Sequence, residues 1–379
     1  MTTTINNEHK KLNVPNLRFK EFQGEWEEYT LQDVVTFSNG KAHENCVNDD
    51  GDYILVNSKF VSTNGQVQKR VTSQLSPLHK SQFVMVMSDL PNGKALAKCF
   101  YVEEDNKYTL NQRVCSFTSN DGNVSRFLMY QINRNKYYLR FDDGINQTNL
   151  KKSEVLSCPV FIPIVREQEK IATLLCKIDE RIATQNKIIE DLKKLKSAIR
   201  KKMFSLLKDE YTESFEINQL LDYEQPTAYI VANDEYSTDT SLTPVLTANK
   251  GFILGYTDEK FGIYQKGECI IFDDFTMDAK YVSFPFKVKS SAIKILTAKP
   301  NVNLRFMFEY LSYWELKSEG HKRHYISEIA SLVIELPSKE RQSIIASLMT
   351  SLNSKLDIEA KTKIRYEEQK RYLLSQMFI

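Results

Sequence analysis

The chain has 379 residues, of which 41% are hydrophobic and 26% charged, a balance that excludes a largely disordered protein. This length favours two or three domains over a single core. The formal net charge of +2 excludes neither nucleic acid nor protein as a partner, because local patches of charge decide such binding.

No run of about 18 apolar residues occurs, so we expect no membrane-spanning helix and no membrane partner. The first residues lack the apolar segment of a signal peptide, which predicts a cytoplasmic location. The six cysteines have neither metal-ligand nor redox-motif spacing, so we expect reduced thiols and no bound metal.

The first predicted domain spans residues 1–163 and comprises an N-terminal arm and a globule. Runs rich in valine, isoleucine and aromatic residues, such as Phe83–Leu90, predict short strands, because Gly, Asn and Asp separate them. Arg126–Ile132 is typical of a helix. We therefore expect a mixed α/β domain that is mostly sheet, and α+β as the fold class.

A long helix is predicted next, over residues 164–208, because apolar residues recur there at spacings of three and four. Pro163 lies just before its start and Glu167 in its first turn, where an acidic side chain complements the helix dipole. At 1.5 Å per residue such a helix is about 60 Å long, which exceeds what a globular domain needs.

A second globule, residues 209–337, and a second long helix, residues 338–379, complete the chain. Within the globule, Gly267–Phe275 and Lys280–Lys289 predict strands, and Leu304–Lys317 predicts a helix. The order of elements is therefore globule, helix, globule, helix.

The second half of the chain repeats the first, since the two long helices align without a gap at an offset of 174 positions. The aligned pairs include Pro163 with Pro337, Gln168 with Gln342, Ile171 with Ile345 and Phe204 with Phe378. A tandem duplication explains this register. It predicts two tandem domains separated by two long antiparallel helices that form a coiled coil with a pseudo-twofold repeat. The alternative is that both are core helices of one domain.

The middle of the second long helix carries polar residues where the first stays apolar, which leaves surface for partner subunits. We predict that the aligned positions near the starts of the helices bind these partners. They are Gln168, Ile171, Gln342 and Ile345.

Each globule presents basic and amide side chains in predicted loops. Amide and guanidinium groups can form paired hydrogen bonds with base edges, and lysines can hold phosphates. The candidate DNA-binding residues are Asn57, Lys59, Lys69, Arg70, Lys94, Asn146, Gln147, Thr148, Asn249, Lys250, Lys280, His321, Lys322 and Arg323. For any one of them taken alone, a solvated surface role is the competing interpretation.

Catalytic motifs are absent: the chain has no phosphate-binding glycine loop, no GxSxG and no HExxH. One acidic group, with Asp273, Asp274, Asp278 and Lys280, could bind magnesium in a nuclease. These residues lie almost within one strand and turn, so a surface turn or a base-contacting loop is the favoured interpretation. A stand-alone nuclease and a helical protein-interaction scaffold remain alternatives.

Three segments resemble the specificity subunit of type I restriction-modification systems: Val14–Val34, Gly144–Ile182 and the helix after Pro337. The resemblance covers nearly the whole chain, and its most specific part is the Pro, Gln and Ile-Ala pattern that opens both helices. One departure is Gly320–Ile329, which reads GHKRHYISEI, so the amide residues of the first loop have no counterparts in the second.

The resemblance implies a noncatalytic subunit with two target recognition domains, each reading one half of a bipartite double-stranded DNA target. It implies two methyltransferase (modification) subunits and restriction (translocase/nuclease) subunits as partners. S-adenosylmethionine, ATP and Mg would bind to those partners and not to this chain. The two rigid helices would then act as a ruler that sets the unread spacer between the half-sites.

Overall fold

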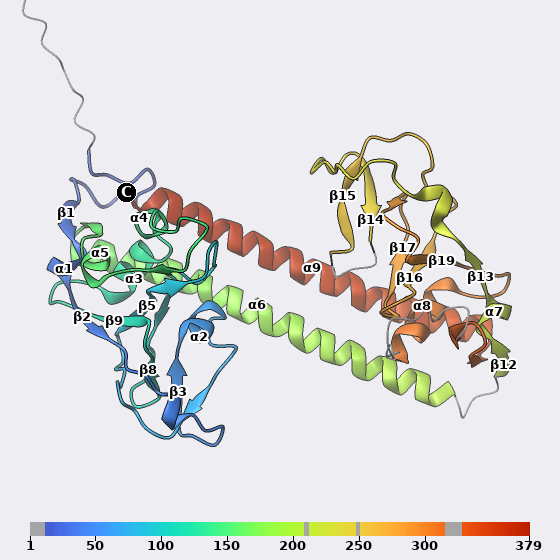
Figure 1. Cartoon of the computed structure of the whole chain (residues 1–379), viewed down its shortest axis with the longest axis horizontal. Coiled ribbons are helices and arrows are strands. Elements are labelled where there is room, and N and C mark those ends of the chain that lie inside the picture. Colours follow the sequence, from blue (N-terminus) through green and yellow to red (C-terminus); the bar gives the residue numbers. More distant parts are fainter. Residues whose placement is uncertain (1–11, 208–211, 248–250, 315–327) are drawn as a thin grey trace, which may run out of the picture. The chain divides into compact units, whose positions relative to one another are not determined.

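A computed structural model describes residues 12–207, 212–247, 251–314 and 328–379. The chain forms two compact units: the first contains residues up to 184 together with 363–379, and the second contains residues 185–362. Each unit combines a globular α+β domain with parts of both long helices (Figure 1). The four predicted segments follow the order of the chain. The compact units differ from them, because the first unit also contains the end of the second long helix and the second unit contains much of the first long helix.

The first unit is built on a four-stranded sheet of order β2-β9-β5-β7 and a three-stranded sheet of order β4-β3-β8. Its strands are β1 (Glu27–Thr30), β2 (Val35–Asn39), β3 (Tyr53–Val56), β4 (Arg70–Val71), β5 (Phe83–Val86), β6 (Ser88–Asp89), β7 (Cys99–Tyr101), β8 (Tyr108–Leu110), β9 (Val114–Ser119), β10 (Thr148–Asn149) and β11 (Pro159–Ile162). Its short helices are α1 (Leu31–Val34), η1 (Glu44–Cys46), α2 (Ser58–Ser62), α3 (Ser125–Ile132), α4 (Lys136–Leu139) and α5 (Lys152–Leu156).

The second unit has a four-stranded sheet of order β13-β19-β16-β17 and a three-stranded sheet of order β15-β14-β18. Its strands are β12 (Glu213–Glu216), β13 (Leu221–Glu224), β14 (Thr243–Leu246), β15 (Ile253–Thr257), β16 (Cys269–Asp273), β17 (Ala279–Val282), β18 (Lys287–Val288), β19 (Ile293–Ala298) and β20 (Val333–Leu336). Its short helices are α7 (Ile217–Leu220), η3 (Pro226–Tyr229) and α8 (Leu304–Tyr313).

The two units share one topology. In each, the first strand pairs antiparallel with the last, β1 with β11 and β12 with β20. In each three-stranded sheet the central strand pairs parallel with one neighbour, β3 with β8 and β14 with β18. The registers also match: Phe83 lies opposite Tyr101 in the first unit, as Ile270 lies opposite Tyr281 in the second. This agreement extends the repeat from the helices to the sheets.

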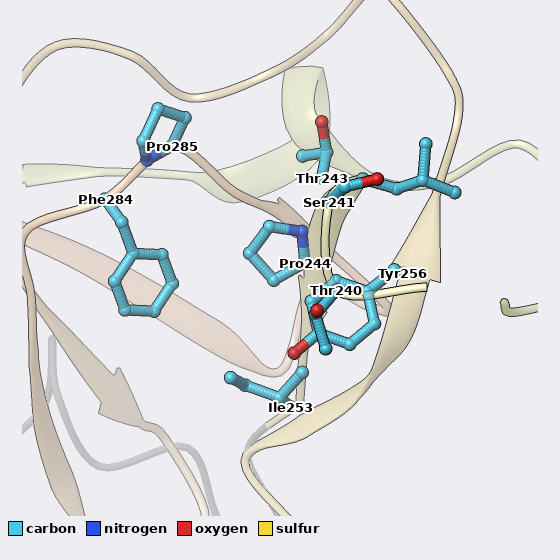
Figure 2. Close-up of a pocket in the computed structure, with 9 residues that line it drawn as sticks. Thr240, Ser241, Thr243, Pro244, Ile253, Tyr256, Phe284 and Pro285 are labelled. Atoms are coloured by element: carbon cyan, nitrogen blue, oxygen red, sulfur yellow. The ribbon is translucent and has the colours of Figure 1, made fainter. Parts of the chain in front are cut away.

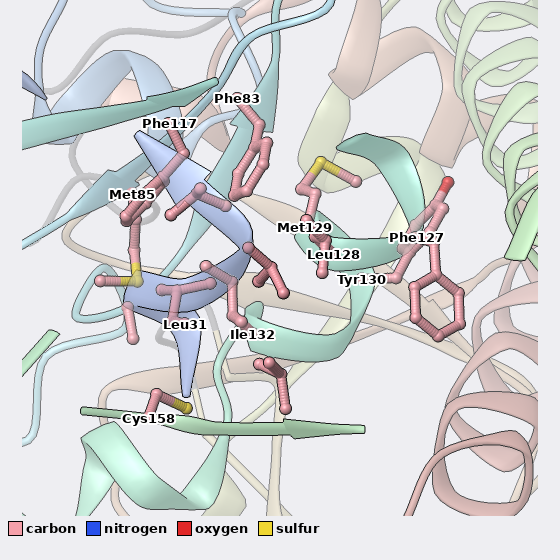
Figure 3. Packing of buried hydrophobic residues seen from close by; sticks show 14 of the residues in the cluster. Leu31, Phe83, Met85, Phe117, Phe127, Leu128, Met129, Tyr130, Ile132 and Cys158 are labelled. Atoms are coloured by element: carbon pink, nitrogen blue, oxygen red, sulfur yellow. The ribbon is translucent and has the colours of Figure 1, made fainter. Parts of the chain in front are cut away.

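Each unit has its own apolar cores, because inward-facing residues alternate along the strands. In the first unit, Phe83 and Phe117 stack with ring centroids 5.0 Å apart inside the cluster drawn in Figure 3. Phe127 and Leu128 of α3 belong to the same cluster, and Figure 3 shows the ring of Phe127 pointing away from Phe83 and Phe117. In the second unit Ile270, Leu296 and Phe306 are fully buried in the equivalent cluster. Separate cores make each unit a folding domain in its own right.

The long helices are α6 (Val165–Leu206) and α9 (Lys339–Met377). Within the first unit Asp179 of α6 pairs with Lys370 of α9 at 2.5 Å, and within the second unit Gln185 donates to the backbone oxygen of Glu359 at 3.1 Å. A residue later in α6 therefore contacts a residue earlier in α9, which shows that the two helices are antiparallel. Gln185 and Glu359 are themselves aligned positions of the two long helices, at the offset of 174. No helix in the described part of the chain has the length and apolar character that crossing a membrane requires.

The N-terminal arm is fastened to both long helices within the first unit. Arg18 forms a two-pronged ion pair with Glu167 of α6, with N–O distances of 2.8 and 2.7 Å, and the Glu167 side chain is fully buried. The backbone N–H of Leu17 donates to the carbonyl of Gln376 in α9 at 2.8 Å. Glu167 therefore anchors the arm as well as lying in the first turn of its helix.

A buried glutamine joins each long helix to its domain. Gln168 accepts from the backbone N–H of Val124, just before α3, at 2.9 Å, and donates to the carbonyl of Pro163 at 2.9 Å. Gln342 repeats this with Asn303, before α8, at 2.8 Å and with Pro337 at 2.9 Å. Both amides, with Ile171 and Ile345, are at most 1% exposed. These four residues, predicted to bind partner subunits, thus lie inside the fold and offer no surface to a partner.

Replacing Gln168 or Gln342 with Ala is expected to destabilise its unit by about 1–3 kcal/mol, because a buried N–H and a buried carbonyl lose their partner. Urea unfolding of the full chain measures this loss. The exposed Gln32→Ala serves as the control, with an expected change within about 0.5 kcal/mol. If Gln168→Ala and Gln342→Ala change the free energy of unfolding as little as the control does, the glutamines do not hold helix and domain together.

Candidate nucleic-acid interface

In the first unit, four of the predicted DNA-binding residues gather around β3, α2 and β4. Asn57 caps α2 by accepting from the backbone N–H of Phe60 at 2.9 Å. Arg70 of β4 donates to the carbonyl of Gly51 at 3.0 Å. Lys59 and Lys69 are exposed and carry their charges at the surface. Asn57 thus shapes this region, and the exposed Lys59, Lys69 and Arg70 are cations available at its surface.

The other four predicted residues of the first unit, Lys94 and Asn146–Thr148, lie on two segments that the structure brings together. Strand β6 pairs with β10, and Asn92 donates from its side chain to the carbonyl of Gly144 at 3.2 Å. Lys94 follows β6, so it lies on the loop facing the Asn146–Thr148 segment. The sequence did not predict this proximity, because β6 and β10 are far apart in the chain and meet only when the two strands pair.

Hydrogen bonds hold the Asn146–Thr148 segment in one conformation. Asp143 accepts from the backbone N–H of Asn146 at 2.8 Å and from its side chain at 2.9 Å. These bonds, the backbone one first, lower the pKa of Asp143 to about 2, so the loop keeps them at neutral pH. Gln147 donates to Ser88 at 2.8 Å, and Thr148 is buried. Lys94 and the exposed faces of Asn146 and Gln147 are left to meet a ligand.

In the second unit the structure describes one predicted DNA-binding residue, Lys280 of β17, which pairs with Asp278 at 2.7 Å. The other five lie outside the described residues. They are Asn249, Lys250, His321, Lys322 and Arg323.

The acidic group considered for a nuclease is used within the fold. Asp273 accepts from the backbone N–H of Phe275 at 2.9 Å and from the hydroxyl of Thr276 at 2.6 Å, which closes the turn after β16. Asp274 is buried and lies 3.5 Å from the buried ammonium of Lys294. Among the described residues, no three His, Cys, Asp or Glu side chains converge as metal ligands. The geometry therefore favours a structural turn.

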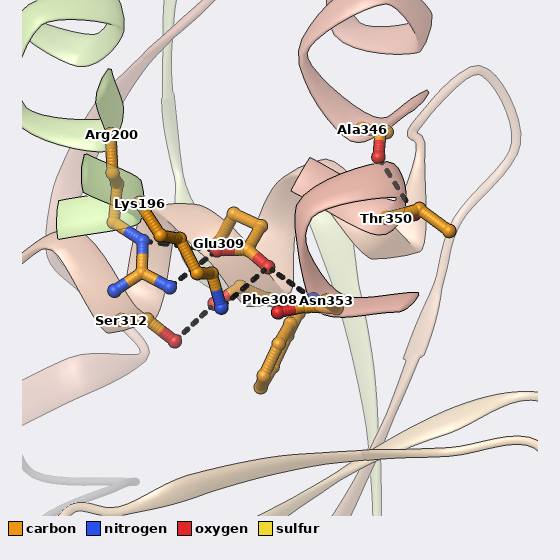
Figure 4. Close-up of polar contacts among 8 residues, drawn as sticks. All are labelled: Lys196, Arg200, Phe308, Glu309, Ser312, Ala346, Thr350 and Asn353. Carbon is orange, nitrogen blue, oxygen red and sulfur yellow. Dashed lines mark hydrogen bonds and ion pairs between the residues drawn. The ribbon is translucent and has the colours of Figure 1, made fainter. Parts of the chain in front are cut away.

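The basic segment Lys193–Lys202 of α6 meets an acidic partner within its own unit. Arg200 donates twice to Glu309 of α8, at 3.0 and 2.6 Å, and Lys196 lies 3.8 Å from the same carboxylate (Figure 4). Asn353 of α9 donates to it at 3.3 Å, and the Glu309 side chain is fully buried. This cluster ties α8 to both long helices. Glu309 was not among the predicted residues, because a charged residue in a helix is usually exposed.

The first unit has a cluster at the equivalent place with its charges rearranged. Tyr130 of α3 donates to Asp179 of α6 at 2.7 Å, and Lys370 of α9 pairs with the same carboxylate. Burial, followed by the charge of Asp179, raises the pKa of Tyr130. Tyr130 aligns with Glu309, because each lies six residues after the backbone N–H that the aligned glutamine accepts from, Val124 or Asn303. At the offset of 174, Asp179 aligns with Asn353 and Lys370 with Lys196. The acidic residue lies on a long helix in the first unit and on the domain helix α8 in the second. A lysine, Lys370 or Lys196, lies beside it in both units.

Another candidate, a pocket beside β14 and β15, is lined by apolar and hydroxyl side chains. Figure 2 shows Pro244, Ile253 and Phe284 around it, with Thr240 and Tyr256 contributing hydroxyls. Among the residues that the structure describes, none that line this pocket is charged. Its described lining therefore lacks the cations that a nucleic-acid backbone requires.

Comparison with known proteins agrees with this architecture. The family described as "Type I restriction modification DNA specificity domain" matches residues 23–194 and again residues 210–368. The chain is 39% identical over 178 residues to the specificity subunit of the type I restriction enzyme EcoR124I/EcoR124II of Escherichia coli, covering 42% of this chain and 43% of that protein. It is 23% identical over 261 residues to a putative type I restriction enzyme MjaX specificity subunit of Methanocaldococcus jannaschii, covering 61% of each. The matches thus span about half the length of these relatives.

Solved structures share the fold. The S subunit of a type I restriction-modification system from M. genitalium has a TM-score of 0.65 at 16% identity, covering 97% of this chain and 99% of that one. A chain from a structure on complex assembly and conformational transition of the type I R-M system has a TM-score of 0.55 at 12% identity, covering 97% and 99%. With two family matches that together cover most of its length, the chain belongs to the type I restriction modification DNA specificity domain family.

Proposed function

We propose that the chain is the noncatalytic DNA sequence-specificity subunit of a type I restriction-modification complex, and that each domain reads one half of a bipartite target. The observation that carries this is the duplicated domain: one topology occurs twice, each copy with its own core and each fastened to the same helix pair. Two related surfaces carried by one chain suit the two half-sites of one duplex.

The proposal includes partners that supply the chemistry. Two methyltransferase subunits would dock on the helices and domains, and restriction subunits would complete the nuclease, with S-adenosylmethionine, ATP and Mg bound to them. The methyltransferase would extrude an adenine from the duplex to reach it. The complex would act on DNA in the cytoplasm. Because Gln168, Ile171, Gln342 and Ile345 are buried, exposed helix positions such as Ile188 and Ile358 are better placed to meet a partner.

Methylation mapping of a genome exposed to the chain and its methyltransferase subunit tests the proposal. We expect methylated adenines within one motif made of two short sequences and a gap of constant length. A continuous motif, or an assembled complex that methylates nothing, would contradict it. Magnesium-dependent cleavage by the purified chain, abolished by Asp274→Ala, would instead support the nuclease. Salt-insensitive assembly without a DNA footprint would support the scaffold.

The same mapping tests the helices as a ruler. Adding one helical turn to both α6 and α9 lengthens each by about 5.4 Å. Since a base pair rises about 3.4 Å, we expect the gap in the motif to change by one or two base pairs while both half-sites stay the same. A motif with an unchanged gap would show that the helices do not set the spacing.

A further inference from the structure

The second unit contains a pocket rich in positive charge where its domain meets the two long helices. Lys193 and Lys196 of α6, Lys280 of β17 and Arg305 of α8 line it, and Asp357 supplies the one carboxylate among its described lining residues. Tyr281 and Phe308 form part of its apolar wall. This surplus of cations beside aromatic rings suits a ligand that carries negative charge on a compact group.

The cations of this pocket are incompletely neutralised. Lys280 pairs with Asp278 at 2.7 Å, and Lys196 lies 3.8 Å from Glu309, which Arg200 already holds more closely. Among the described residues, no carboxylate lies within 4.0 Å of the charged groups of Lys193 or Arg305. Burial lowers the pKa of Lys196, the charge of Glu309 opposes this effect, and the charges of Arg200 and Arg305 add to it. Such repulsion is what a bound anion would relieve.

The duplication supplies an internal comparison. Arg305 stacks on Tyr281 at 3.5 Å, as the aligned Arg126 stacks on Tyr101 at 3.9 Å in the first unit. There, however, Glu103 pairs with the arginine.

Three aligned positions differ between the units in the same direction. Ser283 takes the place of Glu103, Lys280 that of Phe100, and Lys193 that of Glu367. All three differences make the second unit more positive, and together they outweigh the opposite difference at Asp357, which takes the place of Ala183.

We propose that this pocket is a phosphate-binding site of the second unit, and that its ligand is a phosphate of the DNA backbone. The inference rests on the proposed function and adds a contact confined to one half of the molecule. A planar guanidinium held flat on Tyr281 is preorganised to bind two phosphate oxygens, and the lysines add point charges around it. A contact of this kind positions the duplex without reading its sequence.

Three variants of the full methyltransferase complex test the proposal. Ser283→Glu gives the second unit a carboxylate at the position of Glu103, which neutralises Arg126 in the first unit. Lys193→Gln removes one cation from the pocket. Lys194→Gln is the matched control, because it removes an exposed charge from the same helix outside the pocket. Binding to a duplex with the mapped target is measured over a range of salt concentrations.

We expect Ser283→Glu and Lys193→Gln to weaken binding several-fold and to lower the salt slope by about one relative to the control, with the methylated motif unchanged. Ser283→Glu and Lys193→Gln variants that bind like the control would overturn the proposal. A complex that binds no bipartite target at all would refute the proposed function itself.

Neutral methylphosphonates placed singly along the duplex identify the source of the phosphate. At one position we expect the substitution to weaken the wild-type complex and to leave the Lys193→Gln complex unaffected. If no position behaves in this way, and ATP or inorganic phosphate binds the wild-type complex but not Lys193→Gln, the ligand is a free phosphate compound and the DNA assignment is wrong.

Discussion

Exchanging residues 209–337 for the same segment of a family member with another target is expected to replace one half of the methylated motif and to leave the other half and the gap unchanged. The second domain has its own pair of sheets and, around Tyr264 and Phe286, a core formed by its own residues, so its surface moves with it. Each wrong base pair costs about 1–3 kcal/mol, so a half-site of several pairs changes almost completely.

Methylation mapping of the hybrid complex measures this exchange. The control is the same exchange with a donor whose second half-site is identical, which should leave the motif as it was. A hybrid in which both halves of the motif change would show that the domains do not read DNA independently. This outcome would refute the two-domain account of recognition while leaving the fold intact.

The second large effect is expected from Glu309→Leu. The substitution leaves the partly buried cations of Arg200 and Lys196 without their common carboxylate. Breaking a buried ion pair from one side costs about 3–5 kcal/mol, because the remaining charge stays desolvated. Urea unfolding of the full chain, with hydrogen exchange to localise the change, should report a loss in the second unit. Glu367→Leu, on the surface of α9, is the control and should stay within about 0.5 kcal/mol.

The first unit suggests how to repair this defect. Combining Glu309→Tyr with Asn353→Asp and Arg200→Leu installs the residue types found at the aligned positions Tyr130, Asp179 and Leu374. Lys196 would then pair with the carboxylate that Asn353→Asp introduces, as Lys370 pairs with Asp179. We expect this triple variant to regain most of the stability that Glu309→Leu loses. A triple variant no more stable than Glu309→Leu would show that the two clusters are not interchangeable.

The helices were the most predictable part of the fold, because periodicity and end signals are local. Residues 164–208 and 338–379 were expected, and α6 and α9 run over Val165–Leu206 and Lys339–Met377. Their antiparallel pairing followed from the repeat and is confirmed by the contacts of Asp179 and Gln185. The order of the strands was not predictable, since it depends on pairing between distant segments.

The candidate site was predicted less well, because the type of a side chain does not reveal its exposure. Gln168 and Gln342 were aligned correctly, yet as buried connectors they serve the fold and offer no surface. Asn57 and Thr148 likewise serve local structure, one as a helix cap and the other inside a strand pair. Lys193 and Arg305 were not among the predicted residues, because only the packing of α6 and α8 brings them into one pocket.

The sequence by itself determined the duplication, the two long helices and the family, because these depend on residue order and spacing, which a chain carries before it folds. Tertiary structure alone decided which charges are buried, which cations share a pocket and which loops meet. Burial and electrostatic pairing act through space, so segments far apart in the chain, such as Arg200 and Glu309, become neighbours only after the sheets and helices have packed.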